Sequence, residues 1–247
     1  MLKRFHALKG IFASLRTYHG RREHRDGLDR LYARFVQRGD LVFDVGAHVG
    51  DRVGAFRRLG ARVVAVEPQP ALVRVLTVLY GRDRAVTIEP LVIGRTDGYA
   101  ELMINHANPT VSTASPAFVA AAAGAPGWEK ESWTERLRLP MTTLDALIAR
   151  HGMPTFIKID VEGFEAEALA GLSTPVPALS FEFTTIQRDV ALTALSALAA
   201  LGYEKFDASL GESHRLMHGA WQSASRMRDW IAGLPHAANS GDVYALR

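Results

Sequence analysis

Two acidic residues, Asp44 and Glu67, lie at the ends of two short apolar segments, and two glycines follow Asp44. Both segments have the apolar composition that is typical of buried parallel strands. In nucleotide-binding α/β sheets, an acid at the tip of the second strand accepts hydrogen bonds from ribose hydroxyls. Glu67 lies roughly 20 residues after the first glycine, which is the expected separation. These residues therefore predict a ribose-containing cofactor, bound where two neighbouring strands end.

The loop after Asp44 differs from the loop that binds dinucleotides. Gly46 and Gly50 allow a tight turn and a close approach of a ligand, but His48 lies at the centre of the segment between them. The G-x-G-x-x-G fingerprint that goes with a pyrophosphate at a helix start is absent. An aspartate before the loop suits a cationic ligand, such as the sulfonium and amino groups of S-adenosylmethionine. We therefore expect Asp44 to orient the methionine end of this ligand, directly or by bracing the glycine loop.

Three further acids, Asp160, Glu162 and Glu182, are the candidates for catalysis. Asp160 ends an apolar segment and Glu182 stands between two phenylalanines, so both belong to predicted buried strands whose carboxyl ends line a cleft. Burial is expected to raise the pKa of Asp160, which suits a base that works near neutral pH. The three acids can serve as bases toward a hydroxyl group or hold a divalent metal ion, although a metal is not favoured. The alternative to a catalytic role for Glu182 is an ion pair with Lys158. Lys158 precedes Asp160 by two residues, so the two side chains point to the same side of their strand.

Three segments together resemble the FkbM family of S-adenosylmethionine-dependent methyltransferases: Asp44-Val-Gly-Ala-His-Val-Gly-Asp51, Glu67-Pro68 and Ile157-Lys-Ile-Asp-Val-Glu-Gly-Phe-Glu165. The resemblance covers roughly residues 40–205. His48 departs from it, because that family more often has Asn there, although either side chain can donate a hydrogen bond to a ligand. The resemblance implies an α/β, Rossmann-like class I methyltransferase fold with a mostly parallel seven-stranded sheet and helices on both faces.

The same resemblance implies S-adenosylmethionine as cofactor and O-methylation of a hydroxyl on a sugar, glycolipid or polyketide-like natural product. The residues expected to bind the cofactor are Asp44, Gly46, His48, Gly50, Glu67 and Asp160. Residues 89–92 are candidate neighbours of the adenine ring, with plain strand core as the alternative. Ser112 and Thr113 are candidate substrate contacts.

The apolar periodicity indicates which elements position these residues. It predicts strands at 41–45, 63–67, 85–89, 99–104, 137–141, 156–160, 178–183, 203–206 and 242–246, the last antiparallel, with residues 91–94 continuing the apolar character of the third. It predicts helices at 1–20, 28–36, 51–59, 70–80, 143–150, 165–170, 190–201 and 221–234. Thr142 or Thr143 is expected to cap the helix that follows it.

Residues 105–136 lose this periodicity and contain two of the four tryptophans, Trp128 and Trp133. A loop of this length inside a compact domain is usually functional or mobile. We interpret it as an insertion over the cofactor cleft that shapes the acceptor pocket; the alternative is a surface excursion with its tryptophans folded into the core.

The composition limits the other classes of function. A chain of 247 residues suits one α/β domain (residues 39–247) with an N-terminal helical extension (residues 1–38). The absence of cysteine excludes disulfides and thiolate catalysis and fits a cytoplasmic protein. A net charge of +3 is too small to indicate nucleic-acid binding. The expected partner is therefore a small-molecule or glycan acceptor, and a homo-oligomer is compatible with the sequence.

The N-terminal segment, residues 1–20, has the pattern of a basic amphipathic helix, with one apolar face formed by Phe5, Leu8, Ile11, Phe12 and Leu15. It either packs on its own domain or a partner subunit, or lies on a membrane surface. His106 and His214 are interpreted as solvated loop residues. Two other functions stay open: a NAD- or nucleotide-binding oxidoreductase, and a non-catalytic binding module that docks through this helix.

Overall fold

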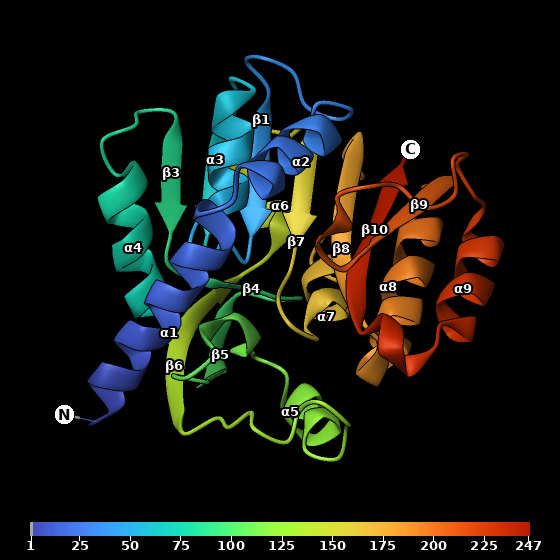
Figure 1. Ribbon diagram of the computed structural model, residues 1–247. Helices are drawn as coiled ribbons and strands as arrows, with labels where there is room; N and C mark the ends of the chain where they lie inside the picture. Colours follow the sequence, from blue (N-terminus) through green and yellow to red (C-terminus); the bar gives the residue numbers. More distant parts are fainter. Residues whose placement is uncertain (1) are drawn as a thin grey trace.

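The computed structural model describes residues 2–247, with side chains from residue 9 onward, and is organised around a seven-stranded sheet (Figure 1). The order of the strands is β3-β2-β1-β7-β8-β10-β9. They are β1 Leu41–Val45, β2 Arg62–Val66, β3 Val86–Glu89, β7 Phe156–Ile159, β8 Ala178–Thr184, β9 Lys205–Leu210 and β10 Ser240–Leu246. Only β10, which lies between β8 and β9, runs antiparallel to its neighbours. The predicted fold, a mostly parallel class I methyltransferase sheet, is confirmed.

Helices cover both faces of this sheet because successive residues of each strand point to opposite sides. In β1, Leu41, Phe43 and Val45 join one hydrophobic cluster, whereas Val42 joins the other. The first cluster includes side chains of α6 Leu144–His151, α7 Glu165–Leu169, α8 Arg188–Ala200 and α9 Ala224–Gly233. The second includes side chains of α2 Arg22–Tyr32, α3 Asp51–Arg58 and α4 Pro70–Tyr80.

A second, three-stranded sheet lies below the carboxyl ends of the main strands in Figure 1. Its order is β4 Val92–Ile93, β6 Glu135–Thr142 and β5 Gly98–Ile104. Residues 91–94 continue the apolar character of β3 but form a separate strand, because Val92 and Ile93 pair with β6 instead of β2. After β6, the hydroxyl of Thr143 accepts a hydrogen bond from the Ala146 amide at 3.0 Å and caps α6, as predicted.

The segment between β5 and β6 is less irregular than its sequence suggests. It contains a short 3-10 turn, Pro109–Val111, and the helix α5 Pro116–Ala122, which Ser115 caps through the Phe118 amide. Phe118 is fully buried and makes edge contacts with the rings of Trp128 and Trp133. The sequence of residues 105–136 lacks apolar periodicity because most of these residues form a loop. Two tryptophans of this loop pack against Phe118.

The helix α1 Leu2–His19 crosses the segment around Pro109. A Cβ atom on Gly10 would lie 2.8 Å from the Pro109 ring, so the glycine allows the close crossing. Ile11 and Leu15 of the predicted apolar face are partly buried beside the buried Ser14, whereas Phe12 is 69% exposed, so the face that packs matches the predicted one only in part. Phe5 and Leu8 lie outside the described side chains. Within residues 2–247, we find no helix that has both the length and the apolar character needed to cross a membrane.

Two predicted boundaries are wrong for local reasons. The helix α2 begins at Arg22 and ends at Tyr32, not at 28–36, because its first turn is polar and exposed and carries the Arg22–Asp26 ion pair. The strand β9 spans Lys205–Leu210 instead of 203–206, because the pairing with β10 continues through Asp207, Ala208 and Ser209.

Candidate functional site

The loop between β1 and α3 is fixed by hydrogen bonds of its own backbone. The amides of Gly46 and Ala47 both donate to the carbonyl of Val66, each at 2.9 Å, and tie the loop to the tip of β2. Gly46 has a positive φ of 84°, and a Cβ atom there would lie 1.8 Å from the carbonyl oxygen of Asp160. Only glycine fits both the turn and this approach to the end of β7.

Glu67 holds the other side of the same loop. Its carboxylate accepts hydrogen bonds from the amide of His48 at 2.9 Å and from the amide of Gln69 at 2.8 Å. The residue is 2% exposed, and burial raises its pKa to about 8 although these two amides oppose the shift. Because a carboxylate has about four acceptor positions, Glu67 can accept further hydrogen bonds from a ligand.

A cavity of about 350 Å³ opens at the carboxyl ends of the parallel strands, within the size range of small-molecule sites. Leu91, Val92 and Ile93 form part of an apolar wall. Carboxylates from several elements also line it: Asp51, Glu67, Asp160, Glu162, Glu182, Glu212 and Asp242. Against them stands the basic side chain of Arg52. This excess of acids suits a ligand that carries positive charge and disfavours a pyrophosphate.

The three predicted catalytic acids meet at this cavity. Carboxylate oxygens of Asp160, Glu162 and Glu182 all lie within 4.8 Å of one another. Glu162 has a positive φ of 54°, and the hydroxyl of Thr113 donates to its carbonyl at 2.6 Å. The carboxylate of Glu165 accepts from the amide of Val161 at 3.0 Å and braces the same turn. The cluster therefore rests on a strained turn that two neighbouring side chains hold in place.

The ionisation of these acids differs from the expectation. Burial works against the charge of Asp160, but Lys158 and Arg52 outweigh it and lower the pKa of this carboxyl below its usual value. Burial and the charge of Asp160 raise the pKa values of Glu162 and Glu182 well above their usual range. The prediction of a raised pKa for Asp160 is therefore wrong. Glu182 accordingly donates a hydrogen bond to Asp160.

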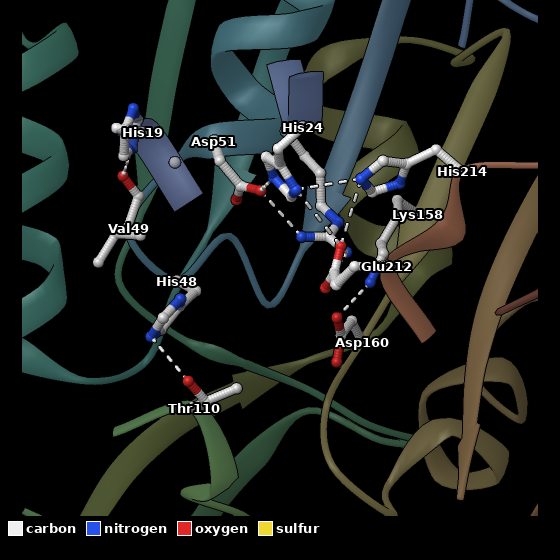
Figure 2. A network of polar contacts seen from close by, with 12 residues as sticks. His19, His24, His48, Val49, Asp51, Thr110, Lys158, Asp160, Glu212 and His214 are labelled. Carbon is white, nitrogen blue, oxygen red and sulfur yellow. Dashed lines mark hydrogen bonds and ion pairs between the residues drawn. The ribbon is translucent and has the colours of Figure 1, made fainter. Parts of the chain in front are cut away.

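The predicted Lys158–Glu182 ion pair is also wrong. The ammonium of Lys158, which is completely buried, contacts Asp160 directly and lies 3.6 Å from Asp242 (Figure 2 shows the contact with Asp160). The register explains this choice, because Lys158 is opposite Ser180 in β8, whereas Glu182 is opposite Asp242 in β10. Lys158 therefore balances the negative charge of two carboxylates, Asp160 and Asp242, from beneath the cavity.

Asp44, which is predicted to orient the methionine end of the ligand, lies beneath the cavity and does not line it. Val45 and Gly46 line the cavity, but Asp44 is fully buried on the same face of the sheet as Lys158. Within the described chain, neither carboxylate oxygen of Asp44 has a hydrogen-bond partner. Burial raises its pKa to about 7, although Lys158 and Arg52 oppose the shift. No hydrogen bond from Asp44 braces the loop either.

Part of the segment 105–136 lines the cavity. Thr110, Val111, Ser112 and Trp128 line it. Thr113 does not, because it is completely buried and its hydroxyl is used by Glu162. The indole of Trp133 also faces inward, where it donates to the carbonyl of Val111 at 2.8 Å.

Histidines take more definite positions than their sequence context suggested. The ring of His48 lines the cavity, lies 3.4 Å from the hydroxyl of Thr110 and is kept neutral because burial lowers its pKa to about 4 (Figure 2). His106 pairs with Glu135 at 2.7 Å, and His214 is buried, so neither is a solvated loop residue. Glu89 bonds to Arg150 and His151 and does not line the cavity, whereas Leu91 and Val92 do.

Several lining residues were missed by the sequence argument. Tyr18, Glu212 and Asp242 come from a helix, a loop and a strand far from the glycine loop, and no local motif connects them. Arg52 could have been found, because it follows Asp51 directly at the start of the helix that the loop opens.

A family model described as the methyltransferase FkbM domain matches residues 44–234. The chain belongs to the FkbM methyltransferase family. This FkbM protein is thus an S-adenosylmethionine-dependent methyltransferase, as the resemblance implied. No curated protein matches it.

Solved structures are similar to this FkbM protein at low identity. Precorrin-6Y C5,15-methyltransferase from Geobacter metallireducens is 12% identical with a TM-score of 0.43, over 90% of this chain and 87% of that one. A TehB-like SAM-dependent methyltransferase from Corynebacterium glutamicum is 12% identical with a TM-score of 0.45, over the same shares. Aeropyrum pernix fibrillarin with natively bound S-adenosyl-L-methionine is 11% identical with a TM-score of 0.43, over 86% of this chain and 68% of that one.

The charged, hydrogen-bonding and apolar groups that line the cavity of this FkbM protein suit S-adenosylmethionine. The cofactor carries a cationic sulfonium, and most of the charged residues that line the cavity are acids. One carboxylate oxygen of Glu182 is buried there without a hydrogen-bond partner in residues 2–247. Glu67 retains acceptor positions for hydroxyl groups, and the apolar wall at Leu91 offers a surface for an aromatic ring.

Proposed function

We propose that this FkbM methyltransferase moves a methyl group from S-adenosylmethionine to a hydroxyl oxygen on a sugar, glycolipid or polyketide-like natural product. One observation carries the hydroxyl assignment: the clustering of Asp160, Glu162 and Glu182 at the cavity. A hydroxyl group is a poor nucleophile and needs a group that removes its proton.

The half of the cavity near β1 and β2 would hold the cofactor. Glu67 would accept hydrogen bonds from the ribose hydroxyls, and Leu91 and Val92 would lie against the adenine ring. Gly46, Gly50 and His48 would shape the loop around the methionine end, with Asp160 opposite. The cofactor supplies an electrophilic methyl group on a sulfonium, so the protein mainly has to align the acceptor.

The acid cluster would control the proton of the acceptor. In the free protein, burial and the charge of Asp160 raise the pKa values of Glu162 and Glu182 and so favour their protonated forms. A cation in the cavity favours the charged form of facing carboxyls and lowers their pKa values. Glu162, for which no hydrogen bond occupies the carboxylate in the described chain, would then become the proton acceptor, while Asp160 stays ionised beside Lys158 and orients Glu182.

A divalent metal at these three acids is the weaker alternative. The ammonium of Lys158 already contacts Asp160 and neutralises the negative charge that would attract a metal ion. The contact of a buried ammonium with a carboxylate is strong and would have to be broken first. The base is therefore the proposed role of the cluster.

Two measurements test the proposal in sequence. Calorimetric titration should show binding of S-adenosylmethionine and S-adenosylhomocysteine by the wild type at tens of micromolar or below, with no competition from NAD. Transfer from methyl-labelled S-adenosylmethionine to a panel of sugars, glycolipids, polyketide alcohols and matched amines should then label hydroxyl acceptors. Failure to bind the cofactor, or displacement by NAD, would refute the cofactor assignment; transfer to amines alone would refute the hydroxyl assignment.

A further inference from the structure

A second polar cluster joins the N-terminal extension to the body of the enzyme beside the glycine loop. His24 belongs to α2, whereas Glu212 and His214 belong to the loop after β9. Figure 2 shows these three side chains turned toward one another, with Asp51 beside His24. The two imidazole side chains are 10% and 8% exposed, and Glu212, at 46%, leaves one side of the cluster open.

The distances in this cluster are those of a metal site. His24 Nδ1 lies 3.1 Å from His214 Nε2 and 3.8 Å from Glu212 Oε2, and the last two atoms are 3.6 Å apart. The two contacts to Glu212 are too long for hydrogen bonds. The point equidistant from the three atoms lies about 2.0 Å from each of them, and zinc binds imidazole nitrogen and carboxylate oxygen at roughly 2.0–2.2 Å.

The ring of His24 is prepared for this role by its other nitrogen. Nε2 lies 3.0 Å from Asp51 Oδ2, and a carboxylate can only accept, so this nitrogen carries the proton. Nδ1 therefore presents its lone pair to the centre of the cluster. A carboxylate that orients a histidine in this way is a regular feature of metal ligation. On the other side, Arg52 donates to both carboxylate oxygens of Glu212, to Oε1 at 3.3 Å and to Oε2 at 3.4 Å, and Oε2 also faces the histidines.

The backbone at His214 itself and the backbone of α2 at Gly27 allow the His214 ring to pack closely in the cluster. Its φ of 52° lies in the left-handed region, which non-glycine residues rarely adopt and which occurs at functional sites. The ring packs on α2 at Gly27, where a Cβ atom would lie 2.8 Å from its Cδ2 atom. A glycine inside a helix weakens it, so its presence here fits a close approach of this ring.

We propose that His24, Glu212 and His214 bind a zinc ion, with a fourth position open on the side of Glu212. The ion would connect α2 to the loop after β9 and fix Asp51 at the start of α3. Charge favours it, because two acids, Asp51 and Glu212, contact the single cation Arg52 at this place. To bind, His214 only has to move its proton from Nε2 to Nδ1. The proposal does not depend on methyl transfer.

Zinc titration of the full-length protein without a histidine tag tests this site. Competition with a chromogenic chelator should show one equivalent of Zn²⁺ bound by the wild type, and the ion should raise the Tm. His24→Gln and His214→Gln should weaken binding by about a hundredfold or more, and Asp51→Asn by roughly 10- to 100-fold. Thermal unfolding without metal identifies variants that fold; if His214→Gln does not, Glu212→Gln replaces it.

Two matched controls decide where the ion binds. His106→Gln removes a histidine that pairs with a glutamate elsewhere, and Glu162→Gln disrupts the acid cluster of the cavity. Both should bind zinc like the wild type. The proposal is overturned if the wild type takes up no zinc at micromolar concentrations, if the ligand variants keep wild-type affinity, or if Glu162→Gln alone abolishes binding, which would place the ion at the acid cluster.

Discussion

The two halves of the cavity are held together by different means. The half around β1 and β2 depends on backbone amides: Gly46 and Ala47 bond to Val66, and two amides bond to Glu67. The half around β7 and β8 depends on side chains that compete for protons and charge, with Lys158 beneath Asp160. The first half is therefore set before any ligand arrives, whereas the second half changes its charge when a cation enters.

The largest effect of a substitution on activity is expected in the half around β7 and β8, which depends on charge. Glu162→Gln keeps the size of the side chain but removes the proton acceptor, so kcat should fall by about 10²- to 10⁴-fold, the usual contribution of a general base. The affinity for S-adenosylmethionine should change much less. Turnover assays together with calorimetry on the same preparation separate the two quantities.

The control for this variant is Glu101→Gln, which changes an exposed acid on β5 away from the cavity. It should leave both kcat and affinity unchanged. Asp160→Asn should also lower turnover more than affinity, but it removes a counter-ion of Lys158, so its stability has to be measured in parallel. If Glu162→Gln retains wild-type kcat on a hydroxyl acceptor, another group takes the proton.

A pH-dependent effect on stability is expected from Asp44, which lies beneath the border of the two halves. Its pKa is raised from 3.8 to about 7, so the folded protein holds a proton that the unfolded chain has lost. The free energy of unfolding must then fall as pH rises through this window. Between about pH 5 and pH 8, this residue alone should account for a fall of about 2–3 kcal/mol.

Asp44→Asn isolates this contribution from the other titrating groups. From about pH 5 to pH 8, the free energy of unfolding of the wild type should fall by about 2–3 kcal/mol more than that of the variant. Urea denaturation at both pH values measures it. A pH-independent difference would show that Asp44 is ionised throughout, stabilised by Lys158 more strongly than burial disfavours it.

The same contrast explains what the sequence could predict. The first two strands, the loop of Gly46 and Gly50, and the position of Glu67 follow from patterns within about 25 residues, because local backbone geometry determines them. The partner of Lys158 could not be predicted, because alternation shows the side of a strand but not the register with the next one. His24 and His214 are 190 residues apart in sequence, so only the folded chain brings them together.

The smallest effect is expected from the preformed half, and it tests whether this half serves the ribose. Glu67→Ala should weaken S-adenosylmethionine binding by about 1–3 kcal/mol, the cost of losing a buried acceptor. Glu89→Ala is the matched control, because Glu89 ends the neighbouring strand β3 but bonds to Arg150 and His151. Equal affinities for Glu67→Ala and the wild type would contradict the ribose assignment, since the amides of His48 and Gln69 would then be the only groups that need this carboxylate.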